Sequence, residues 1–144
     1  MSLVVSFFLV VGKRGYNKQQ MYPLQLLDHF QNPRNAGEIS DADGRAEIEN
    51  PACGDVLRIT VKCSQGRIAQ IRFKAKGCVA AIACGSALTE LAAGKKVDEL
   101  NQLQPENINA AVGGLPQASS HAAQLALDTL SLALSRMRSV STHG

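Results

Sequence analysis

Two stretches in the middle of the chain alternate between apolar and polar residues. One face of residues 56–63 is apolar and carries Leu57, Ile59, Val61 and Cys63. Residues 67–76 repeat the alternation, and their expected inward set is Ala69, Ile71, Phe73 and Ala75. Because only the turn-forming residues 64–66 separate the two stretches, the pattern predicts an antiparallel hairpin. A shorter alternation at residues 45–49 predicts a third strand.

Helical patterns flank these strands. Leu24, Leu27 and Phe30 share one face of a short predicted helix that Pro33 ends. Residues 79–94 are rich in alanine and close on a glycine, and a further short helix is predicted from Pro105 to the glycines at 113–114. A last helix is expected to begin after residue 119 or 120. Its apolar stripe comprises Ala122, Leu125, Ala126, Leu130, Ala133, Leu134 and Met137.

This mixture of strands and helices predicts one α+β domain. With 144 residues, of which 45% are apolar, the chain has material for a single hydrophobic core. The domain is expected to span residues 21–138. Residues 1–20 are interpreted as an N-terminal extension outside it, and residues 139–144, which lack a packing pattern, as a frayed tail.

Charge and hydropathy exclude several classes of function. The 15 basic and 12 acidic residues give a net charge of +3, and the basic residues of 67–76 alternate with apolar ones as on the solvated face of a strand. We therefore expect no nucleic-acid partner. The apolar run at residues 3–12 is too short to cross a bilayer as a helix, and its basic residues follow it. No membrane role is expected, and the predicted location is cytoplasmic.

The hairpin brings two of the four cysteines together. Cys53 lies about 12 residues before the centre of the predicted turn and Cys78 about 13 residues after it, so the two should meet at the open end of the hairpin. Cys63 lies at the turn end, roughly 30 Å away along an extended chain, and is assigned to the core. Cys78 also stands where strand passes into helix, and a helix N-terminus is expected to lower the pKa of its thiol.

Asp55 and His121 complete a candidate metal site. Gly54 allows Cys53 and Asp55 to approach a common point, and His121 begins the last helix. Thiolate ligands favour zinc, Cu(I) or iron-sulfur units, and imidazole is a common zinc or iron ligand. The competing interpretation is that both cysteines are small core residues and that Asp55 caps a turn. Two cysteines at matching distances from one turn, each beside a glycine, favour the metal.

The remaining cysteine and histidines are weaker candidates for metal ligands. Cys84 follows Cys78 by six residues on the predicted helix, which rotates it away from the site, so core packing is expected. It is retained only as a possible substitute ligand. His29 lies in the first helix and His143 in the tail, and neither is predicted to bind metal.

At this point the motifs resemble a known family, the IscU/NifU-type iron-sulfur cluster assembly scaffolds. The stretch DHFQNPRNAG at residues 28–37 is similar to that family's first-helix signature. PACGDVLRI at 51–59 resembles its first cysteine motif, and FKAKGCVAAIACGSALTEL at 73–91 resembles its second. The resemblance runs from about Met21 to Met137. It implies a SufE/NifU (IscU)-like α+β fold, with a three-stranded antiparallel sheet packed by helices.

The resemblance also implies a function, partners and cargo. Family members accept iron, and sulfur from a cysteine desulfurase, build a transient [2Fe-2S] cluster and pass it to apo-proteins. Zinc can occupy the same site. Cys53, Asp55 and Cys78 fall at the metal or cluster end, and the protein would be a scaffold, not an enzyme.

The third family motif departs from the pattern. The family's Leu-Pro-Pro-Val-Lys-Ile-His-Cys corresponds to residues 115–122, Leu-Pro-Gln-Ala-Ser-Ser-His-Ala, so His121 is kept and the third cysteine is Ala122. In the family that cysteine binds metal and accepts persulfide sulfur. Loss of the Pro-Val-Lys portion also argues against docking to the dedicated Hsp70-type chaperone.

Two alternative functions follow. The first is a diverged zinc-binding or sulfur-transfer partner that keeps the fold without building clusters. The second is a Cys-His hydrolase or transferase, which the sequence disfavours because it offers no pattern for an oxyanion hole.

Overall fold

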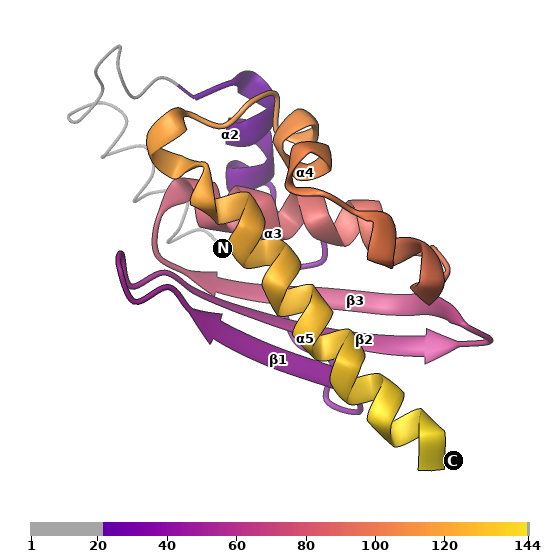
Figure 1. The fold of residues 1–144 in the computed structure, drawn as a ribbon. Helices are drawn as coiled ribbons and strands as arrows, with labels where there is room; N and C mark the ends of the chain where they lie inside the picture. The colour runs from indigo at the N-terminus through magenta and orange to yellow at the C-terminus, as the bar shows by residue number, and fades with distance from the viewer. Residues whose placement is uncertain (1–21, 144) are drawn as a thin grey trace.

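The computed structural model describes residues 22–143, and in these residues the alternating stretches form one sheet (Figure 1). Its strands are β1 (Gly44–Glu49), β2 (Val56–Ser64) and β3 (Arg67–Lys76), in the order β1-β2-β3 and antiparallel throughout. The predicted α+β class and the three-stranded antiparallel sheet are confirmed. The residues expected to form an N-terminal extension lie outside the described part of the chain.

The helices lie on one face of this sheet (Figure 1). They are α2 (Leu24–Gln31), α3 (Val79–Ala92), α4 (Pro105–Ala111) and α5 (His121–His143), with short 3-10 turns at Val97–Gln102 and Gln117–Ser119. Helix α5 extends to His143, and its last residues belong to the segment 139–144 that the sequence analysis interprets as a tail. Within residues 22–143, no helix combines the length and apolar character that crossing a bilayer requires.

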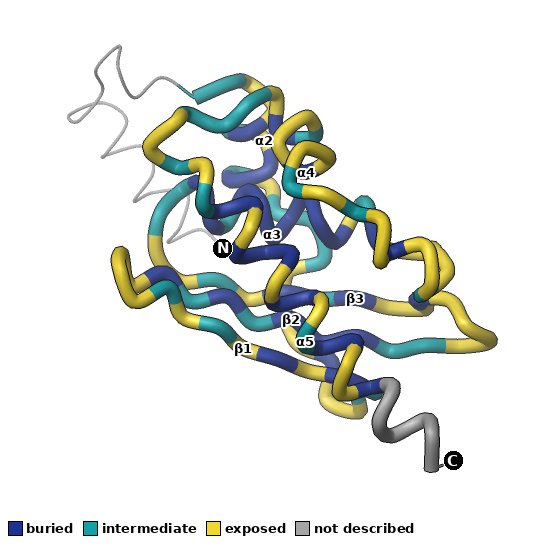
Figure 2. Tube along the Cα trace, in the orientation of Figure 1, coloured by how far each residue is buried: buried dark blue, intermediate teal, exposed yellow. Residues whose placement is uncertain are grey.

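The register of β2 with β3 corrects one prediction. Lys62 pairs with Gln70 but Cys63 pairs with Ile68, so Ala69 is an extra residue in β3. Such a β-bulge shifts the alternation by one position. Ile68 is therefore buried and Ala69 is exposed, whereas the pattern predicted Ala69 to point inward. Beyond the bulge, Ile71 and Phe73 are buried as predicted. Figure 2 shows buried stretches on all three strands of the sheet.

Glycines allow two helices to approach the sheet closely. A Cβ on Gly44 of β1 would collide with the backbone oxygen of Ala133 in α5. A Cβ on Gly85 of α3 would lie 2.6 Å from the ring of Phe73 in β3. The backbone of α5 therefore approaches the backbone of β1 closely, and the backbone of α3 packs directly on the Phe73 ring.

The buried face of α2 differs from the predicted one. Leu26, His29 and Phe30 are buried, whereas Leu24 is 82% exposed. The hydrophobic pattern could not identify this face because one of its members is a histidine. Its burial requires hydrogen-bonding partners, which a helix far away in the sequence provides.

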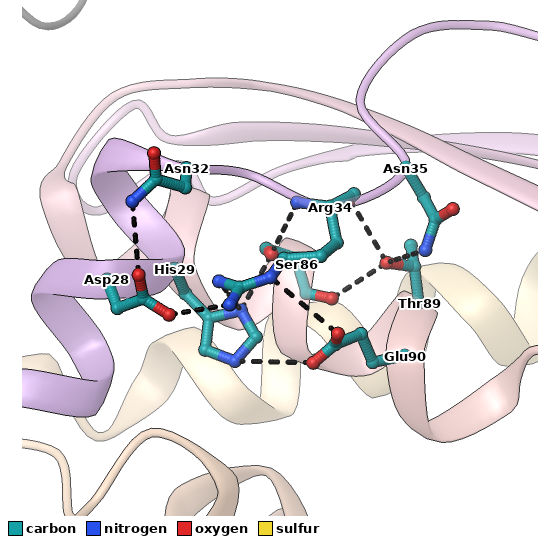
Figure 3. A network of polar contacts seen from close by, with 8 residues as sticks. All are labelled: Asp28, His29, Asn32, Arg34, Asn35, Ser86, Thr89 and Glu90. Atoms are coloured by element: carbon teal, nitrogen blue, oxygen red, sulfur yellow. Dashed lines mark hydrogen bonds and ion pairs between the residues drawn. The ribbon is translucent and has the colours of Figure 1, made fainter.

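A polar network supplies those partners and fastens α2 to α3 (Figure 3). The Ser86 hydroxyl accepts a hydrogen bond from the Arg34 amide at 2.9 Å and lies 2.7 Å from His29 Nδ1. When the neutral ring carries its proton on Nε2, Nδ1 accepts a hydrogen bond from the Ser86 hydroxyl and the Nε2–H faces Glu90 at 3.6 Å. Arg34 also pairs with Asp28 at 2.6 Å. This network explains why polar residues follow the first helix in DHFQNPRN.

Candidate metal centre

Three separate segments meet at one end of the sheet, opposite the β2–β3 turn (Figure 1). The connection from β1 to β2 carries Cys53 and Asp55. Cys78 is the residue immediately before α3, and His121 is the first residue of α5. The hairpin argument from the sequence predicted this end for the two cysteines.

Three side chains at this end of the sheet lie within reach of one metal ion, and a fourth contacts one of them. Single donor atoms of Cys53, Asp55 and His121 all lie within 4.8 Å of one another. The Cys53 Sγ to His121 Nε2 distance is 3.5 Å, and Nε2 lies 3.7 Å from Asp55 Oδ2. Cys78 joins them through Asp55, because its thiol donates to Oδ2 at 3.1 Å. We call these four residues the metal-end cluster.

The loop that presents Cys53 is held by its own hydrogen bonds. The Gly54 amide donates to the Asn50 carbonyl at 2.7 Å, and the Asn50 amide donates to the Asp55 carbonyl at the same distance. The Asn50 side chain accepts from the Ala52 amide at 2.9 Å. Gly54 has a φ of +77°, a conformation that side chains rarely adopt. The sequence Asn-Pro-Ala-Cys-Gly-Asp thus forms a compact turn with Cys53 on its exposed side.

Asp55 is buried and yet charged. Burial acts to raise the pKa of this carboxyl group, but hydrogen bonds from the thiol and the amide of Cys78 lower it more, helped by the Cys53 thiol and the charge of His121. The net result is a pKa below the ordinary value for aspartate. A carboxylate stays available as an oxygen donor among softer ligands.

Cys78 corrects the expectation of a thiol activated by a helix terminus. The Ala81 amide does donate to its sulfur at 3.4 Å. Burial and the hydrogen bond to Asp55 nevertheless dominate and raise the pKa of Cys78 to about 11. In the metal-free protein Cys78 is therefore a thiol that shares its proton with Asp55. A metal ion would have to displace that proton to bind the sulfur.

The other cysteines lie outside the metal-end cluster. Cys84 is completely buried in the core between the sheet and the helices, where burial raises its pKa to about 12. Cys63 lies on β2 near the turn end and packs against the edge of the core, as the sequence predicted. Both ring nitrogens of His29 already have partners, Nδ1 with Ser86 and Nε2 with Glu90. Ala122 is also buried, with 1% of its surface exposed.

The structure adds a role for two further residues of this region, Gly77 and Tyr22, and the sequence reasoning used Gly77 only as a neighbour of Cys78. A Cβ on Gly77 would collide with the Asp55 carboxylate, so this glycine is required for the Asp55–Cys78 contact. Its position directly before a cysteine was the available signal. Tyr22 also reaches the cluster: burial raises its pKa, as does nearby Cys78, while a hydrogen bond with Ser119 lowers it. Nothing in the sequence around Tyr22 predicted this contact.

Comparison with known proteins assigns the family. The sequence model of the NifU-like N terminal domain matches residues 21–142. The chain belongs to this family. The matched residues include nearly all of the described fold and every residue of the metal-end cluster.

Several relatives are similar over most of their length. The "Iron-sulfur cluster assembly scaffold protein IscU 1" of Archaeoglobus fulgidus is 45% identical over 114 residues, which cover 79% of this chain and 74% of the relative. The "Iron-sulfur cluster assembly enzyme IscU" of Drosophila melanogaster is 36% identical over 118 residues, which cover 79% of this chain and 76% of the relative.

A solved structure supports the fold. The N-terminal region of a nitrogen-fixing NifU-like protein from Brucella abortus superposes with a TM-score of 0.70 at 14% identity, covering 84% of this chain and 96% of the other.

Proposed function

We propose that this protein is an iron-sulfur cluster assembly scaffold, which binds iron, holds a transient cluster and passes it to apo-proteins. Relatives at 45% and 42% identity carry the name of such scaffolds. The observation that carries the proposal is the metal-end cluster itself: two thiols, a carboxylate and an imidazole converge from three segments of the chain. This donor set fits iron-sulfur units and zinc.

The cargo is a [2Fe-2S] cluster, assembled from iron and sulfur, with zinc as an alternative occupant. Cys53 and Cys78 would supply sulfur ligands, His121 a nitrogen and Asp55 an oxygen. A carboxylate oxygen holds an iron-sulfur unit less firmly than a thiolate does. A mixed set of donors therefore suits a protein that must release its cluster, and Ala122 leaves it without a third thiolate.

The partners follow from this role. We propose that a cysteine desulfurase supplies sulfur and that apo-proteins receive the cluster, in the cytoplasm. The cluster is cargo, so the protein would act as a carrier and not as an enzyme with small-molecule turnover, although one relative is named an enzyme. The altered segment at residues 117–119 argues against a dedicated Hsp70-type chaperone as an additional partner.

Anaerobic reconstitution of the full chain tests the function. Ferrous iron and sulfide are added, visible absorption is recorded, and iron and zinc are measured. The loaded protein is then mixed with an apo-ferredoxin. Charge-transfer bands with about two irons per cluster, followed by their transfer, are expected. A colourless protein with about one zinc per chain would instead identify the diverged zinc-binding partner.

A further inference from the structure

Strand β1 forms one border of the sheet, and in the described part of the chain no strand pairs with its outer side. The Arg45 carbonyl points away from β2, because it accepts a hydrogen bond from Arg136 of α5 at 3.1 Å. The Asn50 amide is out of phase with it and points inward, donating to the residue just before β2. Main-chain groups alternate along a strand, so those of Arg45, Glu47 and Glu49 face the open edge.

The opposite border of the sheet, along β3, is covered. The Gly37 amide donates to the Phe73 carbonyl at 2.8 Å, and the Phe73 amide donates to the Asn35 carbonyl at 3.0 Å. Residues 94–97 pair with the start of the same strand. Among the described residues, the outer side of β1 has the Arg136 side chain instead of such a segment. Because unpaired main-chain groups at a sheet edge accept a further strand, β1 is the edge at which one can be added.

A hollow of about 330 Å³ opens along this edge. Its walls are formed by Glu38, Arg45, Ala46, Glu47, Arg58 and Arg136. The two carboxylates of the hollow are already paired, because Arg58 lies 3.0 Å from Glu38 and 2.8 Å from Glu47. Arg136 donates to a main-chain carbonyl and has no carboxylate partner among the described residues. Its guanidinium group is therefore available to a carboxylate brought from outside.

Helix α5 passes over β1 and supplies two side chains above the edge (Figure 1). Leu132 precedes Arg136 by one helical turn, so the two lie on the same face of α5, about 6 Å apart along its axis. Leu132 is half-buried against the core. Side chains on one face of a strand repeat every two residues, about 6.7 Å. An added strand would thus place two alternate side chains beneath Leu132 and Arg136, and an apolar and an acidic residue fit these places.

A second copy of this chain fits the edge less well than a different protein does. The side chains of β1 on the helix side are Ala46 and Ile48, which bring no carboxylate to Arg136. A two-fold axis through the edge would also direct each α5 helix toward its own copy, because each packs closely on its own β1. The charge and the shape of the edge therefore favour a segment of another protein.

We infer that the open edge of β1 is a docking site for an extended segment of a partner protein, which adds as a further strand with an acidic residue at Arg136 and an apolar residue at Leu132. Main-chain hydrogen bonds to β1 supply affinity, and the two side chains supply specificity. On docking, the Arg136 guanidinium moves from the Arg45 carbonyl to the incoming carboxylate. None of these residues belongs to the metal-end cluster, so the inference does not depend on the proposed function.

The probe is the synthetic peptide Ser-Thr-Val-Thr-Glu-Thr-Ser, blocked at both ends and titrated into the isotope-labelled full chain. By NMR, the amide signals of Arg45, Glu47 and Glu49 are expected to shift and their hydrogen exchange to slow. A peptide with lysine in place of its glutamate should bind about fivefold more weakly, and a fully N-methylated peptide should not bind. Equal affinity of the three peptides, or no shift at these amides up to about 5 mM peptide, would overturn the inference.

Two arginine variants test the charged anchor. Arg136→Gln should weaken binding of the glutamate peptide about fivefold. Arg67→Gln is the matched control and should bind as the wild type does. Arg67 is likewise exposed and donates to a main-chain carbonyl, that of Gly94 at 3.2 Å, but it lies on β3. An equal loss in both variants would show that net charge alone attracts the peptide, which contradicts a site at β1.

A proline variant tests the main-chain pairing. The Glu47 amide faces the open edge, so Glu47→Pro removes a donor there without breaking the ladder with β2, and it should abolish binding. Glu47→Gln keeps the amide and should still bind, and urea denaturation confirms that both variants are folded. Full binding by folded Glu47→Pro would refute strand addition. A wild-type chain that is dimeric without peptide, with these edge amides protected, would show that a second copy occupies the edge and would also overturn the inference.

Discussion

Asp55 is the central residue of the metal-end cluster, because it contacts both Cys78 and His121. It is 3% exposed, and it accepts hydrogen bonds from both the thiol and the amide of Cys78. In the metal-free protein it therefore organises the start of α3, and we propose that in the loaded protein it supplies the oxygen donor of the set. These two roles compete, because a carboxylate oxygen bound to metal no longer accepts the hydrogen bond of the Cys78 thiol.

Removing this carboxylate should slow the release of the cluster. In Asp55→Ala the harder, weaker donor is lost, and the softer thiolates hold the iron-sulfur unit more firmly. We expect slower transfer to apo-ferredoxin, followed by the change in visible absorption after mixing. Cys63→Ser serves as the control and should transfer at the wild-type rate. Faster transfer from Asp55→Ala would contradict this role.

Gly77 offers a second test at the scale of single residues. Its φ is +134°, and a Cβ there would collide with the Asp55 carboxylate. Gly77→Ala should therefore cost about 3 kcal/mol of unfolding free energy, through backbone strain and displacement of Asp55. Gly66→Ala is the matched control, because Gly66 has a φ of +79° and open space around it. It should cost only about 1 kcal/mol and leave zinc binding intact.

Urea denaturation measures both variants, and zinc content is determined alongside. The informative outcome is the comparison between them. If Gly66→Ala destabilises the protein as much as Gly77→Ala does, backbone strain alone explains the loss and the contact with Asp55 contributes nothing.

At the scale of elements, the junction of α2 with α3 depends on a neutral histidine. Burial, and then the positive charge of Arg34, lower the pKa of His29 below its ordinary value of 6.5, although Glu90 and Asp28 act in the opposite direction. Folding therefore favours the deprotonated ring. The resulting stability is fully present above pH 6.5 and is lost as the pH falls through the lowered pKa of the folded state.

This junction predicts how stability changes with pH. Between about pH 7.5 and about pH 5.5, the wild type should lose about 1 kcal/mol more unfolding free energy than His29→Gln, which cannot titrate. Urea denaturation at both pH values measures the difference. Asp28→Asn tests whether the neighbouring carboxylate is responsible instead. Parallel losses in the wild type and in His29→Gln would show that His29 does not drive the effect.

The same elements show what the sequence could and could not predict. The strands of the hairpin were predictable because alternation reports directly which face is buried. The bulge at Ala69 was not, since it depends on how Lys62 and Cys63 pair across the hairpin. The buried face of α2 was hidden because His29 is satisfied by Ser86, 57 residues away in the chain. Cysteine spacing likewise predicted that Cys78 lies at this end of the sheet. It could not predict the burial of the thiol and its hydrogen bond to Asp55, which reverse the expected direction of its pKa shift.

At the scale of the whole molecule, the metal-end cluster joins parts that are distant in sequence. Its donors come from the β1–β2 loop, the start of α3 and the start of α5. One bound ion would connect the sheet to two helices that pack on it. Because the unfolded chain does not hold these groups together, binding free energy becomes folding free energy.

Zinc should therefore stabilise the entire fold. At a free zinc concentration of about 100 times its Kd, the gain is about 2.7 kcal/mol, or about 10 °C in Tm for a domain of this size. Differential scanning calorimetry with and without zinc measures it. Cys53→Ser and Cys78→Ser should each lose most of the shift, because each removes a donor from a different segment. Cys63→Ser, on the same sheet but at its other end, should keep it. An equal shift in all three variants would mean that zinc binds elsewhere, and the convergence of Cys53, Asp55, Cys78 and His121 would then have no role in holding metal.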